Sequence, residues 1–328
     1  MTAIAARRLR DTPVVDFGAV PGYGPIFNAG LIAVDGVLHL FARGVRDGYL
    51  RNDGPGPRFL DYVSDVLVFT SEDGLHYSFQ QVLATGADEG AQSLEDPRVQ
   101  RIRADGIEHL LMTYTHLPEP TSGEPWRLGI RRLAYDDGRF ALNPASGRIL
   151  GPPGVPDKDG VLFNLRDGRV ALIHRIHPNM QLAVFDSLAH LYAADGDYWD
   201  AHMHELERHT LIRPANGGLG VGAGAPPVAT AGGLLLFFHE RDADSRYTIN
   251  VALLDEETGA LVSLLAQPIL RPELPWERLG DVDDVLFVQG AFVRADGTVY
   301  LTYGAADRCV GAATVELRPL LDALRAAS

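Results

Sequence analysis

Acidic and basic side chains stand directly before apolar stretches at several places in this 328-residue sequence. The segment Glu95–Arg98 precedes Val99, Asp157–Asp159 precedes a run that begins at Val161, and Asn28 occupies a similar place. Burying charged groups costs free energy unless they are paired. Carboxyl groups can transfer protons, and basic groups can bind anions. We therefore expect a polar site that combines carboxylates with cations.

The basic residues are almost entirely arginine. Of the 29 basic residues, only Lys158 is a lysine. A lysine ammonium is a compact point charge, whereas arginine presents a planar fork of donors, so the two are not interchangeable where the shape of a site matters. Lys158 is therefore a candidate functional residue, with chance retention as the alternative.

The elements that must position these residues form a repeat. Each unit contains an apolar strand, a tight turn with glycine, a second strand that ends at a polar or small residue, and a third strand. The glycines of successive turns are 62 to 70 residues apart, and five copies fill the chain. The turns fall at Asp35-Gly36, Asp105-Gly106, Asp167-Gly168, Gly232-Gly233 and Asp296-Gly297. Such pairs between apolar runs favour type I′ hairpins, because both central residues need positive φ.

A fourth strand follows in four of the five copies. Short apolar pairs mark it at Val82-Leu83, Ile149-Leu150, Leu211-Ile212 and Ile269-Leu270. The fifth copy lacks such a pair, but the segment around residues 12–16, which contains Val14-Val15, has the missing character. We expect this N-terminal strand to complete the last unit and close a ring.

Five four-stranded units predict an all-β fold, a five-bladed β-propeller that occupies residues 1–328 as a single domain. A β-sandwich is the alternative, but it explains neither the period near 65 residues nor the N-terminal complement. Residues 316–327 have leucines at helical spacing, with Pro319 near the first turn, so we expect a short C-terminal helix there. In a propeller the innermost strands line the axis, where polar residues at their ends converge.

Composition and charge argue against several classes of partner. The 43 acidic and 29 basic residues give a net charge of −14, which disfavours binding to nucleic acid or to an anionic membrane. The longest apolar run, Leu234–Phe238, is far too short to span a bilayer. Met1–Arg10 lacks the apolar stretch of a secretory signal, so we expect a cytoplasmic protein.

Metal and disulfide chemistry are also disfavoured. The single cysteine, Cys309, excludes an intrachain disulfide and a multi-cysteine zinc site, and its apolar neighbours predict a buried position. His202, His204 and His209 lack accompanying carboxylates in a pattern that would indicate zinc. We expect no metal site.

Five motifs in order along the chain resemble those of glycoside hydrolase family 130, the β-mannoside phosphorylases and related mannosidases, which are five-bladed propellers. The matching segments are Glu95–Val99, Lys158–Phe163, His174-Arg175, Gly222–Pro227 and Tyr303–Asp307. The resemblance implies an inverting reaction in which inorganic phosphate attacks the anomeric carbon of a β-linked mannose. The products are α-mannose 1-phosphate and a shortened acceptor. The implied partners are a β-mannoside oligosaccharide and phosphate as co-substrate, with no cofactor.

The resemblance also implies roles for individual residues. Asp96 matches the family's general acid, which delivers its proton through the mannose 3-hydroxyl. An inverting hydrolase needs a second carboxylate to activate water. Phosphate is already anionic and nucleophilic, so one carboxylate suffices and cations must hold the anion. Candidates for the phosphate pocket are Arg43, Lys158, Arg175 and His239, with His174 and Tyr247 as weaker ones. Candidates for substrate binding are Asn28, Glu95, Arg98, Asp159 and Asp307.

Several of these residues have other interpretations. Asp96 precedes a proline and also fits a simple turn. Arg98 could pair with a neighbouring carboxylate and hold the acid in place, which is at least as good a role for it as substrate contact. Asn28 and Asp307 could cap the backbone.

The sequence departs from the family pattern at two places. Glu240 follows His239, where phosphorylases usually have glycine, and Asp283-Asp284 stands where Pro-Asn is usual. Glu240 could act as a base for water, so a β-mannosidase is the alternative function, and a propeller that binds glycans without turnover is another. The sequence leaves the acceptor sugar, the linkage and a homo-oligomeric state open.

Overall fold

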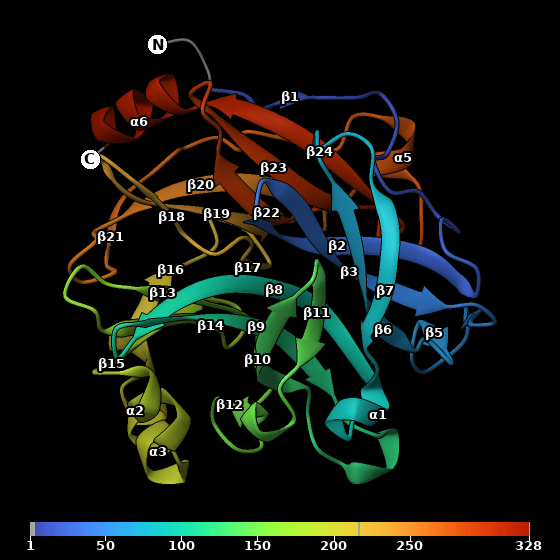
Figure 1. Cartoon of the computed structure of the whole chain (residues 1–328), viewed down its shortest axis with the longest axis horizontal. Helices are drawn as coiled ribbons and strands as arrows, with labels where there is room; N and C mark the ends of the chain where they lie inside the picture. Colours follow the sequence, from blue (N-terminus) through green and yellow to red (C-terminus); the bar gives the residue numbers. More distant parts are fainter. Residues whose placement is uncertain (1–3, 216, 328) are drawn as a thin grey trace.

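A computed structural model of the chain, which describes residues 4–215 and 217–327, consists of five antiparallel sheets arranged around a ring (Figure 1). Each sheet is called a blade here, and its strands follow the chain from the axis outward, except that the outermost strand of the last blade comes from the N-terminal segment. This is the five-bladed propeller that the repeat predicts, with the blades following one another around the ring in sequence order (Figure 1).

The first three blades contain the following strands. Blade 1 is β2 (Tyr23–Val34), β3 (Val37–Arg46), β6 (Ser64–Ser71) and β7 (Ser78–Ala84). Blade 2 is β8 (Ser93–Ala104), β9 (Ile107–Leu117) and β10 (Arg127–Asp136), with an outer strand in two pieces, β11 (Arg139–Leu142) and β12 (Arg148–Leu150). Blade 3 is β13 (Lys158–Asn164), β14 (Val170–Arg175), β15 (Met180–Phe185) and β16 (Thr210–Ile212).

The last two blades are less regular. Blade 4 has an inner strand in two pieces, β17 (Gly220–Ala223) and β18 (Val228–Thr230), followed by β19 (Gly233–Arg241), β20 (Tyr247–Leu254) and β21 (Leu261–Leu264). Blade 5 is β22 (Leu286–Val293), β23 (Thr298–Ala305), β24 (Cys309–Glu316) and β1 (Arg7–Arg8). A small hairpin, β4 (Leu50–Arg51) and β5 (Phe59–Leu60), lies in the loop between β3 and β6.

The five predicted turns all join the first and second strands of a blade, but they are not all type I′. Both central residues have positive φ at Asp35-Gly36 and Asp105-Gly106. At the other three turns only a glycine does. At Asp296-Gly297, for example, the Gly297 N–H donates to Arg294 O (3.1 Å) and the aspartate side chain accepts from Thr298 N (2.9 Å). That geometry is a type I turn followed by a glycine bulge, which is the usual solution for a three-residue loop.

The N-terminal segment pairs with the last blade, but through other residues than expected. The outermost ladder strand is β1, Arg7–Arg8, paired with Thr314 and Ala313 of β24. Within the expected segment 12–16, Val15 forms an isolated bridge to Val310 and Val14 N donates to Val310 O (2.8 Å). The closing strand was therefore expected at the wrong residues. The regular pairing with β24 lies earlier in the chain than residues 12–16, at Arg7–Arg8.

The outer strand of blade 4 also differs from expectation. The apolar pair Ile269-Leu270 pairs with β20 only as an isolated bridge between Leu270 and Ile249, whereas β21 forms the regular outer strand. Both residues are buried. Their apolar character reflects packing in the core rather than a place in the ladder.

Helices occur mainly in the connections. They are α1 (Gly86–Glu89), α2 (Leu188–Ala193), α3 (Gly196–His204), α4 (Leu206–His209), α5 (Pro275–Arg278) and α6 (Leu317–Ala326), with 3₁₀ turns at Pro120–Ser122 and Pro144–Ser146. The expected C-terminal helix is α6, which packs its buried Leu320, Leu321 and Leu324 against the outer strands of blades 4 and 5 (Figure 1). The helical insertion α2–α4 between β15 and β16 was not expected from the sequence.

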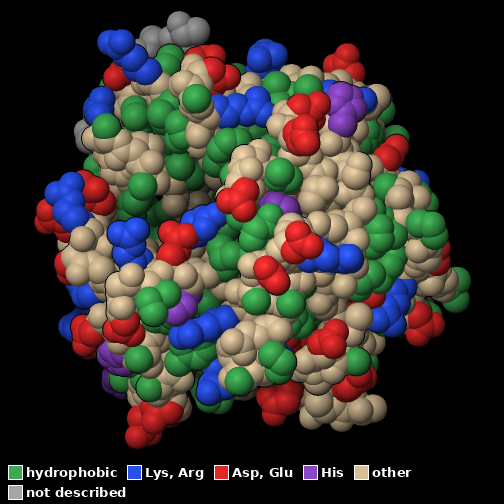
Figure 2. Space-filling view, in the orientation of Figure 1, with side chains coloured by type: hydrophobic (Ala, Val, Ile, Leu, Met, Phe, Trp, Pro, Cys, Tyr) green, Lys and Arg blue, Asp and Glu red, His purple; other side chains and the backbone are tan. Residues whose placement is uncertain are grey.

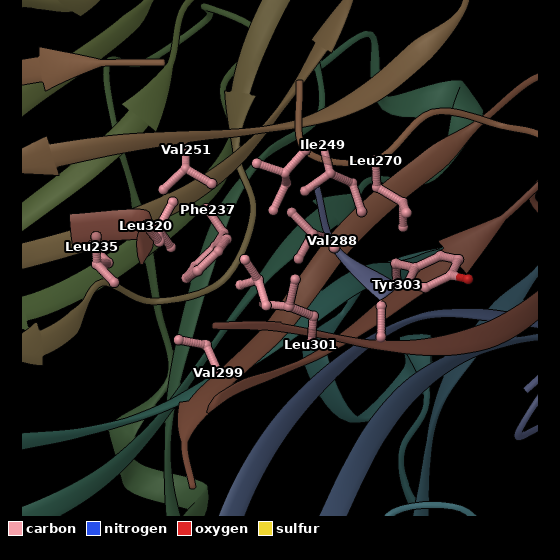
Figure 3. Packing of buried hydrophobic residues seen from close by; sticks show 14 of the residues in the cluster. Leu235, Phe237, Ile249, Val251, Leu270, Val288, Val299, Leu301, Tyr303 and Leu320 are labelled. Carbon is pink, nitrogen blue, oxygen red and sulfur yellow. The ribbon is translucent and has the colours of Figure 1, made fainter. Parts of the chain in front are cut away.

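The apolar core lies between adjacent blades. Figure 3 shows the cluster between blades 4 and 5, where Phe237 and Val251 of blade 4 meet Val288 and Leu301 of blade 5. Leu320 of α6 closes the same cluster. Cys309 is buried in it, as its apolar neighbours predict. Each interface of this kind fixes one blade against the next, which holds the inner strands at the axis in place.

Charged side chains of both signs are spread over the visible face of the molecule (Figure 2). On the face shown in Figure 2, acidic and basic side chains are intermixed, without a broad basic area of the kind that binds nucleic acid. None of the helices in the described ranges is long and apolar enough to cross a bilayer.

Candidate active site

The inner strands of three blades bulge at the same level and direct polar side chains toward the axis. Strand pairing is interrupted at Asn28 in β2, at Asp96 in β8 and at Asp159 in β13, and all three residues have a positive φ between 46° and 57°. A bulge leaves its extra residue out of the ladder and turns its side chain in a new direction. Asparagine and aspartate tolerate this left-handed backbone better than other non-glycine residues.

Asp96 is held on one side and free on the other. Its Oδ1 accepts a hydrogen bond from Nδ2 of Asn28 (2.8 Å) and lies 3.6 Å from a guanidinium nitrogen of Arg43. Its Oδ2 has no hydrogen-bond partner among the described residues. The side chain is 3% exposed. This arrangement fixes the carboxyl group while leaving one oxygen available to carry a transferable proton.

Arg43 belongs to the same half of the site. Its guanidinium lies 2.6 Å from Oε1 of Glu95 and stacks over the rings of Phe27 and Tyr62 at 5.0 and 5.5 Å. Arg43 was expected in the phosphate pocket. The structure instead places it between the carboxylates of Glu95 and Asp96, so its charge is largely balanced by theirs.

Arg98 joins three blades at the axis. It is 1% exposed, and its guanidinium donates to the backbone oxygens of Asp96 (2.9 Å), Ala223 (2.8 Å) and Gly224 (2.8 Å) and to Oδ1 of Asp159 (3.2 Å). These four hydrogen bonds leave the Arg98 guanidinium few N–H groups with which to bind a sugar. Arg98 does hold the acid loop, but through the backbone of Asp96 rather than through either neighbouring carboxylate.

Asp159 and His239 complete this axial cluster. Asp159 Oδ2 lies 3.1 Å from Nε of Arg175 and 3.3 Å from Nε2 of His239, and Asp159 and His239 are fully buried. Burial alone would raise the pKa of Asp159, but Arg175, His239 and Arg98 together hold it well below its usual range. Burial lowers the pKa of His239 to about 4, against the opposing effect of Asp159. His239 is therefore neutral near pH 7 and supplies no positive charge.

Next to this cluster is a pocket of about 190 Å³ that contains the other expected cations. Lys158, Arg175 and Tyr247 line it, together with the exposed rings of Trp126 and His177 and the guanidinium of Arg241. Within the described part of the chain, the Lys158 ammonium has no ion-pair or hydrogen-bond partner. An unpaired ammonium beside two guanidinium groups favours an anion in this pocket.

Asp307 interacts electrostatically with groups in both halves of the site. It follows β23 in a left-handed backbone conformation (φ 50°). Burial raises the pKa of its carboxyl group to about 7, with Asp96 and Glu95 adding to the rise and Arg43 and Lys158 opposing it. The protonation of Asp307 is therefore coupled both to the acid Asp96 and to the cation Lys158.

Two candidates lie away from this arrangement. His174 is fully buried, where it contacts Asp157 (2.9 Å) and His202 (3.2 Å), so it does not reach the pocket. Glu240 accepts a hydrogen bond from Ala215 N (2.8 Å), and as the neighbour of His239 in β19 it points to the opposite face of the strand. Asp283 and Asp284, by contrast, line a neighbouring pocket that shares Arg241 and Tyr247 with the anion pocket, where they accept from Gly280 N and pair with Arg278, respectively.

Sequence reasoning missed several residues of the site. Arg241 and Trp126 line the anion pocket, and Tyr62 covers Arg43 while its hydroxyl donates to Asp281 (3.1 Å). The sequence could have indicated Arg241 as a site residue, because it stands two residues after His239 at the end of the same strand and so lies on the same face. Trp126 and Tyr62 come from loops, whose path the repeat does not specify.

The described residues contain no group of three or more histidine, cysteine, aspartate or glutamate side chains arranged to hold a metal ion. The three histidines considered for zinc have different surroundings. The rings of His202 and His209 stack at 4.1 Å, and His204 is exposed at the end of α3.

Comparison with known sequences gives one family. The profile of glycoside hydrolase family 130, described as β-1,4-mannooligosaccharide phosphorylase, matches residues 5–326. A 1,2-β-oligomannan phosphorylase from Thermoanaerobacter sp. is 28% identical over 331 residues, which cover 97% of this chain and 99% of that protein.

Comparison with solved structures shows the same fold. The β-1,2-mannobiose phosphorylase of Listeria innocua, in complex with β-1,2-mannobiose, superposes with a TM-score of 0.74 at 18% identity and covers 98% of this chain and 99% of its own. A second structure has a TM-score of 0.69 at 18% identity, with 95% and 94% covered. It is described as showing that this family of mannoside phosphorylases contains glycoside hydrolases that target β-1,2 mannosidic linkages in Candida mannan.

Proposed function

The chain belongs to glycoside hydrolase family 130, and from that membership and the geometry of its site we propose that it catalyses inverting phosphorolysis of β-linked mannosides. Inorganic phosphate attacks the anomeric carbon of the terminal mannose while the glycosidic bond breaks. The leaving oxygen takes up one proton, and the products are α-mannose 1-phosphate and a shortened acceptor. No metal or organic cofactor takes part.

Asp96 is the general acid in this proposal. The hydrogen bond from Asn28 and the nearby Arg43 occupy Oδ1, so Oδ2 is the oxygen that carries the proton toward the sugar. The proton passes to the leaving oxygen through the mannose 3-hydroxyl, the route that the family resemblance implies. General acid catalysis of this kind contributes about 10² to 10⁴ in rate.

Phosphate binds in the pocket formed by Lys158, Arg175 and Tyr247, with Arg241 as an additional cation. This pocket is the observation that carries the proposal, since the Lys158 ammonium has no ion-pair or hydrogen-bond partner among the described residues. The mannose binds beside Asp96, where Asn28, Glu95 and Asp307 offer hydrogen-bonding groups. A carboxyl group with a pKa near 7, such as that of Asp307, can both donate to and accept from a sugar hydroxyl.

Hydrolysis by a β-mannosidase is the second candidate, because a solved relative is described as belonging to a group with such hydrolases. The expected base for water, Glu240, gives this candidate little support. Its carboxylate is bonded to Ala215 N and lies on the face of β19 opposite His239. A base directed away from the axial cluster cannot activate water beside Asp96.

A product assay tests the proposal. The enzyme is incubated with β-1,2- and β-1,4-mannobiose, with and without phosphate, and mannose 1-phosphate and free mannose are quantified. We expect mannose 1-phosphate in proportion to the phosphate supplied. Asp96→Asn should lose at least about 10²-fold in rate. Asp105→Asn is the matched control, since Asp105 ends the same strand region with the same left-handed backbone but lies in a turn outside the site.

The same assay separates the alternatives. Glu240→Gln should be nearly silent. Free mannose as the main product at saturating phosphate, together with an inactive Glu240→Gln variant, would establish the mannosidase instead. A wild-type protein that binds mannobiose but releases no product would indicate a glycan-binding propeller.

A further inference from the structure

A chain of three buried polar side chains adjoins the anion pocket. Asp157 directly precedes Lys158, and its Oδ2 lies 2.9 Å from Nδ1 of His174. Nε2 of His174 in turn lies 3.2 Å from Nε2 of His202, which belongs to α3 of the helical insertion in blade 3. Asp157 and His174 are fully buried, and His202 is 3% exposed. We call Asp157, His174 and His202 the buried histidine chain.

The hydrogen bonds of this chain hold His174 from both sides. Burial, together with the rings of His174 and His209, lowers the pKa of His202 to about 3, so His202 is neutral at neutral pH. The carboxylate of Asp157 can only accept, so Nδ1 of His174 donates to it. The two Nε2 atoms share the second hydrogen bond, in which His202 donates to a neutral His174 or accepts from a protonated one. In either case His202 fixes the orientation of the His174 ring.

The far end of the chain holds the backbone that carries the two cations. Asp157 Oδ1 accepts a hydrogen bond from the backbone N–H of Arg175 (3.2 Å), and Lys158 and Arg175 are direct partners in the ladder between β13 and β14. Regular pairing stops immediately after Lys158, where β13 bulges. The Asp157 carboxylate therefore clamps the two strand ends at the point where the ladder no longer does so.

We propose that His202 is a positioning residue for the anion pocket. Acting through His174 and Asp157, it fixes the separation and direction of Lys158 and Arg175, and so sets the affinity of the pocket for an oxyanion. This inference rests on the proposed function for the identity of that oxyanion as phosphate. It also gives the insertion α2–α4 a role, because these helices carry the residue that ends the chain.

Titration of inorganic phosphate into the full-length protein by calorimetry tests the inference without relying on turnover. His202→Phe keeps an aromatic ring beside Trp199 but removes the hydrogen-bonding nitrogen, whereas His202→Gln keeps a side-chain amide that can donate or accept. We expect His202→Phe to weaken phosphate binding about tenfold or more, because small displacements of positioned groups have large effects. His202→Gln should remain within about threefold of the wild type. His209→Phe, which changes the ring stacked on His202, is the matched control and should bind phosphate normally.

Turnover provides a second readout. In His202→Phe the KM for phosphate should rise while the KM for mannobiose stays unchanged, a split that a general loss of stability would not produce. Unaltered phosphate affinity in a folded His202→Phe variant, or equal weakening in His209→Phe, would overturn the inference. Should His202→Phe not fold, His202→Asn, whose shorter side chain cannot reach His174, provides the same comparison. A wild type that binds phosphate in a His202-dependent way but forms no mannose 1-phosphate would refute the proposed function and leave this inference standing.

Discussion

At the scale of single residues, Asp307 makes stability depend on pH. Burial raises the pKa of its carboxyl group to about 7 in the folded protein, whereas an unfolded chain releases this proton near pH 4. Between these values the folded state holds a proton that the unfolded state has lost. The free energy of unfolding contributed by Asp307 is therefore fully present below about pH 4 and falls as the pH rises toward 7.

Asp307→Asn should remove this contribution. The melting temperature of the variant relative to the wild type should rise steadily between pH 4.5 and 7.5, which thermal melts at half-unit intervals would measure. Using the difference between the two proteins cancels the opposite pH dependence of Asp159 and His239, whose pKa values are lowered by their surroundings. A constant difference across this range would show that Asp307 titrates normally.

Residue types were predictable from the sequence, but their charge states and contacts were not. The motifs identified Asp96, Asp159 and His239, and the structure brings all three to the axis or its edge. His239 was expected as a cation, yet complete burial keeps it neutral, and burial is not visible in a motif. Likewise, two of the four hydrogen-bond partners of Arg98 are backbone oxygens of another blade, which no local pattern encodes.

At the scale of secondary-structure elements, the axial cluster depends on how closely β17 approaches β13 and β19. A Cβ atom on Gly222 would lie 2.1 Å from Oδ2 of Asp159 and 2.4 Å from Nε2 of His239. Neither of these buried groups has room to move without disturbing the contact between Asp159 and Arg175. Glycine is required here for close approach rather than for an unusual backbone angle.

Gly222→Ala should therefore lower kcat/KM for phosphorolysis by about tenfold or more, since it displaces positioned groups. Overpacking should also cost about 1–3 kcal/mol of stability. Steady-state kinetics and a thermal melt check both effects. Gly196→Ala is the control, because a Cβ there meets nothing within 4 Å. Unchanged kinetics in Gly222→Ala would show that the cluster tolerates displacement and is not a fixed part of the site.

The elements of the fold were predicted well where the repeat constrained them. Turn glycines and apolar runs located the inner strands of every blade, because a hairpin between buried strands needs both signals at fixed spacing. The insertion α2–α4 interrupts the repeat and was missed. Its start signals were present, since Ser187 accepts from His190 N (3.1 Å) and Asp195 from Tyr198 N (3.3 Å) as helix caps. Helices this short gain their stability from packing, which is decided only by the tertiary structure.

At the scale of the whole molecule, the ring closes where the N-terminal segment meets the last blade. Arg8 of β1 places its guanidinium 2.7 Å from both carboxylate oxygens of Glu277, and Glu277 is completely buried. Glu277 also accepts from Tyr303 Oη of β23 (2.9 Å) and from the backbone N–H groups of Glu273 and Leu274. One buried carboxylate thus joins the two ends of the chain.

Arg8→Met should destabilise the protein although Arg8 takes no part in the site. The substitution keeps an apolar stem for packing but leaves the Glu277 charge buried without a cation, which typically costs about 3–5 kcal/mol. The three remaining donors on Glu277 limit the loss, so we expect about 3 kcal/mol, seen as a fall in melting temperature of roughly 4–5 °C. Arg7→Met is a matched control in the same strand, because Arg7 is exposed and its side chain has no such partner. Equal melting temperatures for the two variants would mean that the backbone pairing of β1 closes the ring without help from the ion pair, whereas a fall confined to Arg8→Met would show that closure depends on this buried charge.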